Sequence, residues 1–152
     1  MNLIKVLLIA SLSLLAVSTT ALAKDFSWTR DFNIQAKANL SDFKAKMASR
    51  FGLSDFQAMA LRNIFASPAD AYIMLRFGEI KGVLKKLTKD EGKAAIKTYK
   101  SYKSKGWNFL AKILGVDTEC KEYLALKQGQ DLYADMNREQ VVYNNYASAR
   151  VN

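Results

Sequence analysis

The residues with the clearest capacity for chemistry are lysines concentrated in the middle of the chain. From Lys81 to Lys112 the sequence carries ten lysines and only two acids. Four of these lysines recur at steps of four, four and three residues, which places them on one face of a helix. They are Lys89, Lys93, Lys97 and Lys100. Like charges at this spacing repel, by about 0.2–0.5 kcal/mol per pair in an isolated helix. Four lysines that share a helix face despite this repulsion are a candidate anion-binding face.

The basic stretch supplies a wider set of candidate site residues. Seven lysines are predicted to bind anions: Lys85, Lys89, Lys93, Lys97, Lys100, Lys103 and Lys105. Three nearby aromatic residues are candidate contacts for a ligand, although aromatic side chains at this spacing more often pack in a core: Tyr99, Tyr102 and Trp107. The alternative interpretation is a solvated lysine face that keeps the protein soluble.

The positive charge of this stretch indicates an anionic partner. Anionic lipid headgroups, lipopolysaccharide and acidic glycans carry the matching charge. Nucleic acid is disfavoured, because lysines give affinity without reading bases and the chain has no recognised nucleic-acid motif.

The composition excludes several kinds of active site. The 152 residues include no histidine and one cysteine, so a Ser-His-Asp triad, an imidazole metal site and an internal disulfide are ruled out. We predict no catalytic residue, no metal and no cofactor. Carboxylates remain, and Glu79 is the candidate acid of an enzyme, but its place three residues after Arg76 favours an ion pair. The acids Asp117, Glu119 and Glu122 are explained by the dipole of a helix that begins there.

The N-terminus has the pattern of a secretory signal peptide. Lys5 precedes the apolar run 6–17, and a polar patch then leads to the small residues Ala21 and Ala23. A membrane-spanning helix needs about 20 apolar residues, more than this run provides. We therefore predict that 1–23 is a signal peptide cut between Ala23 and Lys24, and that the product is exported, either periplasmic or secreted. In an oxidising compartment the lone Cys120 is expected to be a half-buried, inert thiol.

Helix-capping residues and glycines divide the rest of the chain into short segments. Because helices this short cannot stand alone, we predict one compact all-α domain of six or seven helices over residues 40–129. Phe56 and Leu124 are expected to face its core, and Gly78 to end the third helix. The expected helices cover about 41–51, 54–65, 67–77, 79–87, 88–102, 107–114 and 117–128.

The two ends of the chain leave alternatives open. Residues 24–39 are expected to form an N-terminal arm. Apolar residues at alternate positions of 26–40 fit an extended strand, while the stripe of Trp28, Phe32, Ala36 and Leu40 fits a helix equally well. Residues 130–152 form a polar C-terminal tail, in which 138–148 fits either a strand or a docked helix.

Five short runs of the sequence resemble a set of small exported bacterial helical proteins without an established function. The resemblance covers about 67–129 and implies an exported helical domain, but no activity. The runs are Pro68-Ala69-Asp70-Ala71-Tyr72, Arg76-Phe77-Gly78-Glu79, Lys105-Gly106-Trp107, Ala111-Lys112-Ile113-Leu114-Gly115 and Leu126-Lys127-Gln128-Gly129.

These features together predict a non-enzymatic binding module whose basic face meets an anionic component of the cell envelope. One alternative is a carboxylate-dependent enzyme acting on envelope glycans. Another is a structural or chaperone-like periplasmic protein, in which Met47, Met59 and Met74 would supply adaptable apolar contacts.

Overall fold

The computed structural model describes residues 25–130 and 132, and this part of the chain is helical, with no strand. The predicted single all-α domain is confirmed. Its elements are α2 (Thr29–Ala38), α3 (Leu40–Phe51), α4 (Asp55–Ile64), α5 (Pro68–Ile80), the 3-10 turn η1 (Leu84–Lys86), α6 (Lys89–Tyr102), the 3-10 turn η2 (Lys103–Lys105), α7 (Trp107–Ile113) and α8 (Lys121–Gln128). The predicted signal peptide, its cleavage site and nearly all of the C-terminal tail lie outside the described residues.

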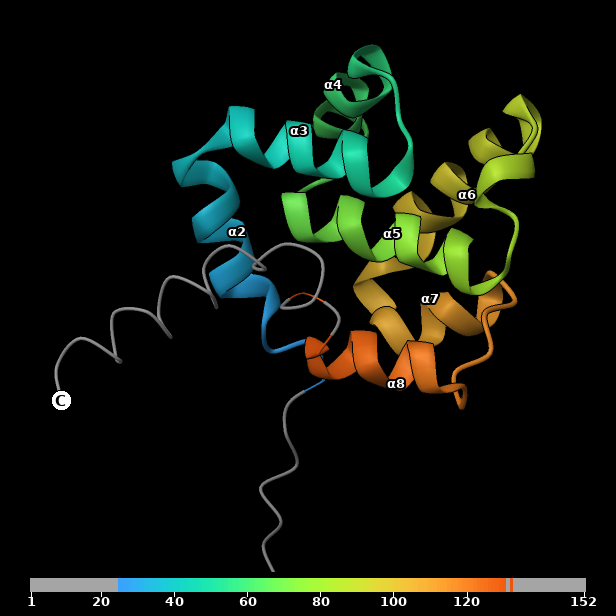
Figure 1. The fold of residues 1–152 in the computed structure, drawn as a ribbon. Helices are drawn as coiled ribbons and strands as arrows, with labels where there is room; N and C mark the ends of the chain where they lie inside the picture. Colours follow the sequence, from blue (N-terminus) through green and yellow to red (C-terminus); the bar gives the residue numbers. More distant parts are fainter. Residues whose placement is uncertain (1–24, 131, 133–152) are drawn as a thin grey trace, which may run out of the picture.

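Helix α5 is the centre of the domain, and α2, α4, α8 and η1 pack around it (Figure 1). Ser67 caps its first turn by accepting a hydrogen bond from the Asp70 N–H, and Pro68 occupies the first helical position. Because other elements cover α5 on most sides, its buried residues lie around the whole helix and not along one face. Its buried residues are Ala69, Asp70, Ala71, Tyr72, Ile73, Arg76 and Phe77.

The two ends of the described chain meet beside this central helix. The indole Nε1 of Trp28 donates a 2.8 Å hydrogen bond to the carbonyl oxygen of Leu126. Gly129 follows with a φ of 74°, and a Cβ there would lie 2.7 Å from the Trp28 ring, so only glycine fits. The described part of the expected N-terminal arm, 25–39, therefore contributes α2 to the domain, and the helical alternative for 26–40 is the one the structure has.

Three expected helix boundaries are wrong. The last helix, α8, begins at Lys121 and not near residue 117. Helix α5 continues through Gly78 to Ile80, and the segment 79–87 forms only the short turn η1. The chain bends at Gly82 instead, where φ is 68°. Gly78 serves close packing, because a Cβ at that position would lie 3.1 Å from the Leu84 side chain.

Two expected core residues are on the surface. The Phe56 side chain is 82% exposed and the Leu124 side chain is 41% exposed. Helices α4 and α8 bury other faces, which carry Ala58 in the first case and Tyr123 with Leu126 in the second. No helix of the described part of the chain is long and apolar enough to cross a membrane.

The leucines of α8 provide a matched test of this packing. Leu126 is fully buried, whereas Leu124 is exposed. We expect Leu126→Ala to lower the free energy of unfolding by about 2–5 kcal/mol, because it removes buried methyl groups and leaves a cavity. Leu124→Ala is expected to cost less than about 1 kcal/mol. Urea denaturation followed by circular dichroism measures both, and equal losses would contradict the orientation of α8.

Candidate functional site

The predicted lysine ridge forms on α6. Thr88 and Glu91 start this helix as a reciprocal capping box, in which the Thr88 side chain accepts from the Glu91 N–H and the Glu91 carboxylate accepts from the Thr88 N–H. The cap defines where the helix begins. Within the helix, residues that follow one another at i+4, i+4 and i+3 project from one face. These residues, called the lysine ridge from here on, are Lys89, Lys93, Lys97 and Lys100, and all four are exposed.

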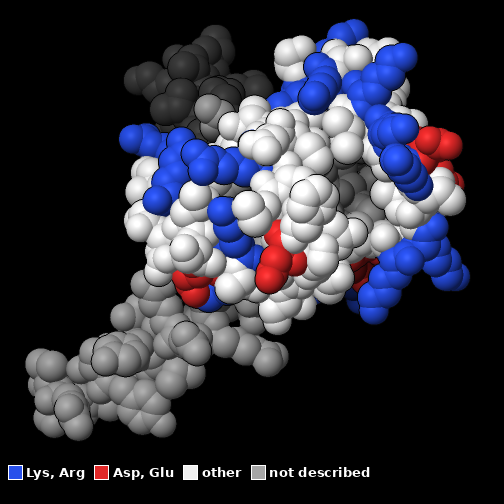
Figure 2. Space-filling view, turned by 90° about the horizontal axis from the view of Figure 1, so that it is seen from above, with Lys and Arg blue, Asp and Glu red and all other residues white. Residues whose placement is uncertain are grey.

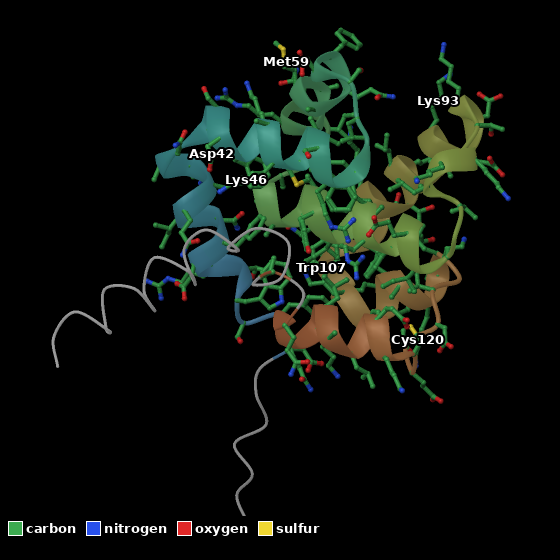
Figure 3. All side chains as sticks on the ribbon, viewed as in Figure 1. Asp42, Lys46, Met59, Lys93, Trp107 and Cys120 are labelled. Atoms are coloured by element: carbon green, nitrogen blue, oxygen red, sulfur yellow. The ribbon has the colours of Figure 1, made fainter. Side chains whose placement is uncertain are left out.

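The ridge has little contact with acids. Lys93 extends away from the body of the molecule (Figure 3), and its Nζ lies 3.8 Å from the exposed carboxylate of Asp90. Lys89, Lys97 and Lys100 form no ion pair with any described residue. Lys85 is also exposed, on η1. The charges of this region are therefore available to an external anion.

Lys105 differs from the ridge lysines in its surroundings. Its ammonium group sits over two aromatic rings, 5.2 Å from the centroid of Phe109 and 5.8 Å from that of Tyr102. Both rings are partly exposed, and their centroids are 5.9 Å apart. Tyr102 is thus the predicted aromatic contact that remains accessible, in a cation–π cluster with Phe109 and Lys105.

Lys103, whose side chain is 36% exposed, directs its ammonium group to a buried carboxylate. Asp70 is 4% exposed and accepts hydrogen bonds from the Lys103 ammonium and from the Tyr99 hydroxyl, the latter at 2.6 Å. The Lys103 ammonium also lies 5.5 Å from the Trp107 ring centroid. Lys103, which the sequence predicts to bind an external anion, is therefore already bound to the carboxylate of Asp70.

The other two predicted aromatic contacts belong to this internal cluster. Tyr99 is buried, and its ring stacks on Trp107 with centroids 6.3 Å apart. Burial and then the hydrogen bond to Asp70 raise the pKa of Tyr99 to about 12. The phenol therefore stays protonated at neutral pH and remains a donor to the carboxylate. Trp107 (Figure 3) is partly buried and packs against the core.

The candidate catalytic carboxylate is engaged in an ion pair. Both oxygens of Glu79 accept hydrogen bonds from the Arg50 guanidinium, at 2.6 Å and 3.1 Å, and Arg76 binds one of them as well. These contacts join α3 to α5. Glu79 is therefore a structural cross-link between two helices, as its spacing after Arg76 indicated.

The remaining sequence candidates have local structural roles. The thiol of Cys120 is half-buried, accepts a hydrogen bond from the Tyr123 N–H and so caps α8. Asp117 accepts one from the Glu119 N–H just before that helix. Among the described residues no group of three or more Cys, Asp or Glu side chains is placed to hold a metal ion.

A groove that the sequence did not indicate lies where α2, α3, α4 and α5 meet. Its volume is about 390 Å³. Three cations border it, and none of its lining residues is acidic. The lining residues are Lys37, Leu40, Phe43, Lys44, Ala58, Leu61, Arg62, Phe65, Ala66, Ser67, Pro68 and Ala71. The cations come from three helices, so no local spacing could have shown that they line the same groove.

Figure 2 looks onto the side of the molecule formed by α3 and α4. Basic side chains gather at its two ends, one toward α2 and α3 and the other toward α6, with mainly uncharged residues between them. On this face, the positive charge therefore lies in two separate areas.

Comparisons with protein-family profiles, with curated proteins and with solved structures each return no match. The function is therefore argued from the geometry of these two basic areas.

The internal ion pair can be tested with two lysines that are two residues apart. We expect Lys103→Met to lower the free energy of unfolding by about 1–3 kcal/mol, because the buried Asp70 carboxylate loses its cation and keeps only neutral donors. Lys105→Met is expected to cost less than about 0.5 kcal/mol, since Lys105 is exposed and has no acidic partner among the described residues. Urea denaturation measures both, and a larger loss for Lys105→Met would contradict the assignment.

Proposed function

We propose that the protein is an exported, non-enzymatic binding module that uses the lysine ridge to bind the anionic lipid surface of the cell envelope. The observation that carries this proposal is the row of four exposed ammonium groups on one face of α6. The ligand chemistry is the phosphate headgroup, whether of an anionic phospholipid or of lipopolysaccharide.

The dimensions of the ridge suit a surface better than a single small anion. Lys89 and Lys100 are eleven residues apart, which corresponds to about 16 Å along a helix. A flat array of headgroups can meet charges spread over this length, and each lysine near an anionic membrane contributes about 1 kcal/mol of attraction.

The ridge is also held rigidly, which lowers the entropy lost on binding. Tyr99 of α6 and Lys103 of the following turn η2 bind Asp70. These contacts hold α6 against the core, while the ridge lysines are exposed. Binding therefore requires ordering of lysine side chains, but no rearrangement of the helix.

The two alternatives receive different support. For the glycan-cleaving enzyme, Glu79 is bound by two arginines and the groove between α2, α3, α4 and α5 contains no acid, so neither feature supports that alternative. For the chaperone-like protein, Met47 is fully buried, but Met59 projects from α4 (Figure 3) beside the exposed Phe56. This small apolar surface is an observation in favour of that alternative.

The proposal is tested by titrating the purified protein with vesicles of anionic phospholipid and with neutral vesicles as a control. At about 10 mM salt, where the Debye length is about 30 Å, we expect binding to anionic vesicles only, weakening as salt is added. The triple variant Lys89→Gln, Lys93→Gln, Lys97→Gln should bind about 100-fold more weakly, from about 1 kcal/mol per lysine. Glutamine keeps the helix propensity, so stability should not fall.

The matched control removes three charges elsewhere. Arg30, Lys112 and Lys121 are exposed and form no ion pair with a described residue, and the triple variant with glutamine at these positions has the same net charge as the ridge variant. It is expected to keep most of the affinity. Equal losses in the two variants, or no binding near 10 mM salt, would rule the proposal out. Binding to an acidic polysaccharide but not to anionic vesicles would replace the lipid with a glycan.

A further inference from the structure

The groove between α2, α3, α4 and α5 has the character of a ligand site separate from the lysine ridge. Its volume of about 390 Å³ falls at the small end of the range of small-molecule sites, about 300–1,000 Å³. Most of its lining is apolar. The apolar residues are Leu40, Phe43, Ala58, Leu61, Phe65, Ala66, Pro68 and Ala71. Such a lining favours a ligand with a hydrocarbon part.

The polar part of the groove has one sign of charge. Lys37 comes from the end of α2, Lys44 from α3 and Arg62 from α4. None of them forms an ion pair with a described residue, whereas the neighbouring Lys46 pairs with Asp42 at 3.0 Å. Three cations without acidic partners at the border of an apolar groove complement a ligand with one anionic end.

The start of α5 also borders the groove, but its N–H groups are already used. The Ala69 N–H donates to the Asn33 side chain at 2.8 Å, and the Asp70 N–H donates to the Ser67 hydroxyl. An anionic headgroup would therefore be bound by the three cationic side chains rather than by the helix terminus.

From these observations we propose that the groove binds a fatty acid, with its alkyl chain on the apolar lining and its carboxylate among Lys37, Lys44 and Arg62. One alkyl chain suits the small volume of the groove, and the negative charge of the carboxylate complements the three cations. This site does not depend on the lysine ridge, so either proposal can fail without the other.

The test uses a fluorescent conjugated polyene fatty acid, cis-parinaric acid, below the concentration at which it aggregates. We expect saturable binding at one site per chain, displacement by myristate, and much weaker displacement by octanoate, because a shorter chain buries less apolar surface. Myristyl alcohol has the same chain without the charge and should displace the probe at least tenfold less well. Equal displacement by the acid and the alcohol would overturn the proposal, since the cations would then have no role.

A charge variant locates the site. The triple variant Lys37→Gln, Lys44→Gln, Arg62→Gln is expected to bind the probe at least tenfold more weakly, with an unchanged circular dichroism spectrum. The variant with glutamine at Arg30, Lys112 and Lys121 has the same net charge and should bind as the unmodified protein does. Equal affinity of the two variants would overturn the assignment. Loss of probe binding as the protein concentration rises would instead assign the groove to a second copy of the chain.

Discussion

The carboxylate of Asp70 is the constraint on which the arrangement of this domain depends. It lies on the central helix α5, 4% exposed, where an ionised group is costly unless it is paired. Its partners, Tyr99 and Lys103, come from α6 and the turn that follows it. The need to compensate one buried charge therefore fixes how α6 sits against the core. Because the inner side of α6 is committed to this cluster, the four lysines of the ridge face outward.

The same principle separates lysines that sequence alone treats as equivalent. Lys100 and Lys103 are three residues apart, yet the first is exposed and the second is bound to a carboxylate 33 residues earlier in the chain. Lys105 is held over Tyr102 and Phe109 instead. A cluster of positive charge in the sequence thus becomes an exposed ridge, an internal ion pair and a cation–π contact. Of the seven lysines, the four of the ridge and Lys85 are exposed and contact neither a buried acid nor an aromatic ring among the described residues.

Local chemistry made much of the fold predictable from the sequence. The helix starts at Ser54, Ser67 and Thr88 were identified correctly, because each cap is made with a residue three positions away. Failures arose where packing between elements decides. Gly78 lies inside α5 with Leu84 of η1 close to it, and α4 buries Ala58 and leaves Phe56 exposed. The ridge was predictable because its residues share one helix, whereas the groove was not, because its cations come from three helices.

The central claim is that Asp70 holds Lys103 inward while the lysine ridge remains outward and meets an anionic surface. Its most direct test is the acetylation rate of each lysine, measured by mass spectrometry with and without anionic vesicles. The account predicts slow modification of Lys103 throughout, together with fast modification of the four ridge lysines that the vesicles slow selectively. Modification of Lys103 as fast as that of Lys97, or vesicle protection spread evenly over Lys112 and Lys121, would contradict it.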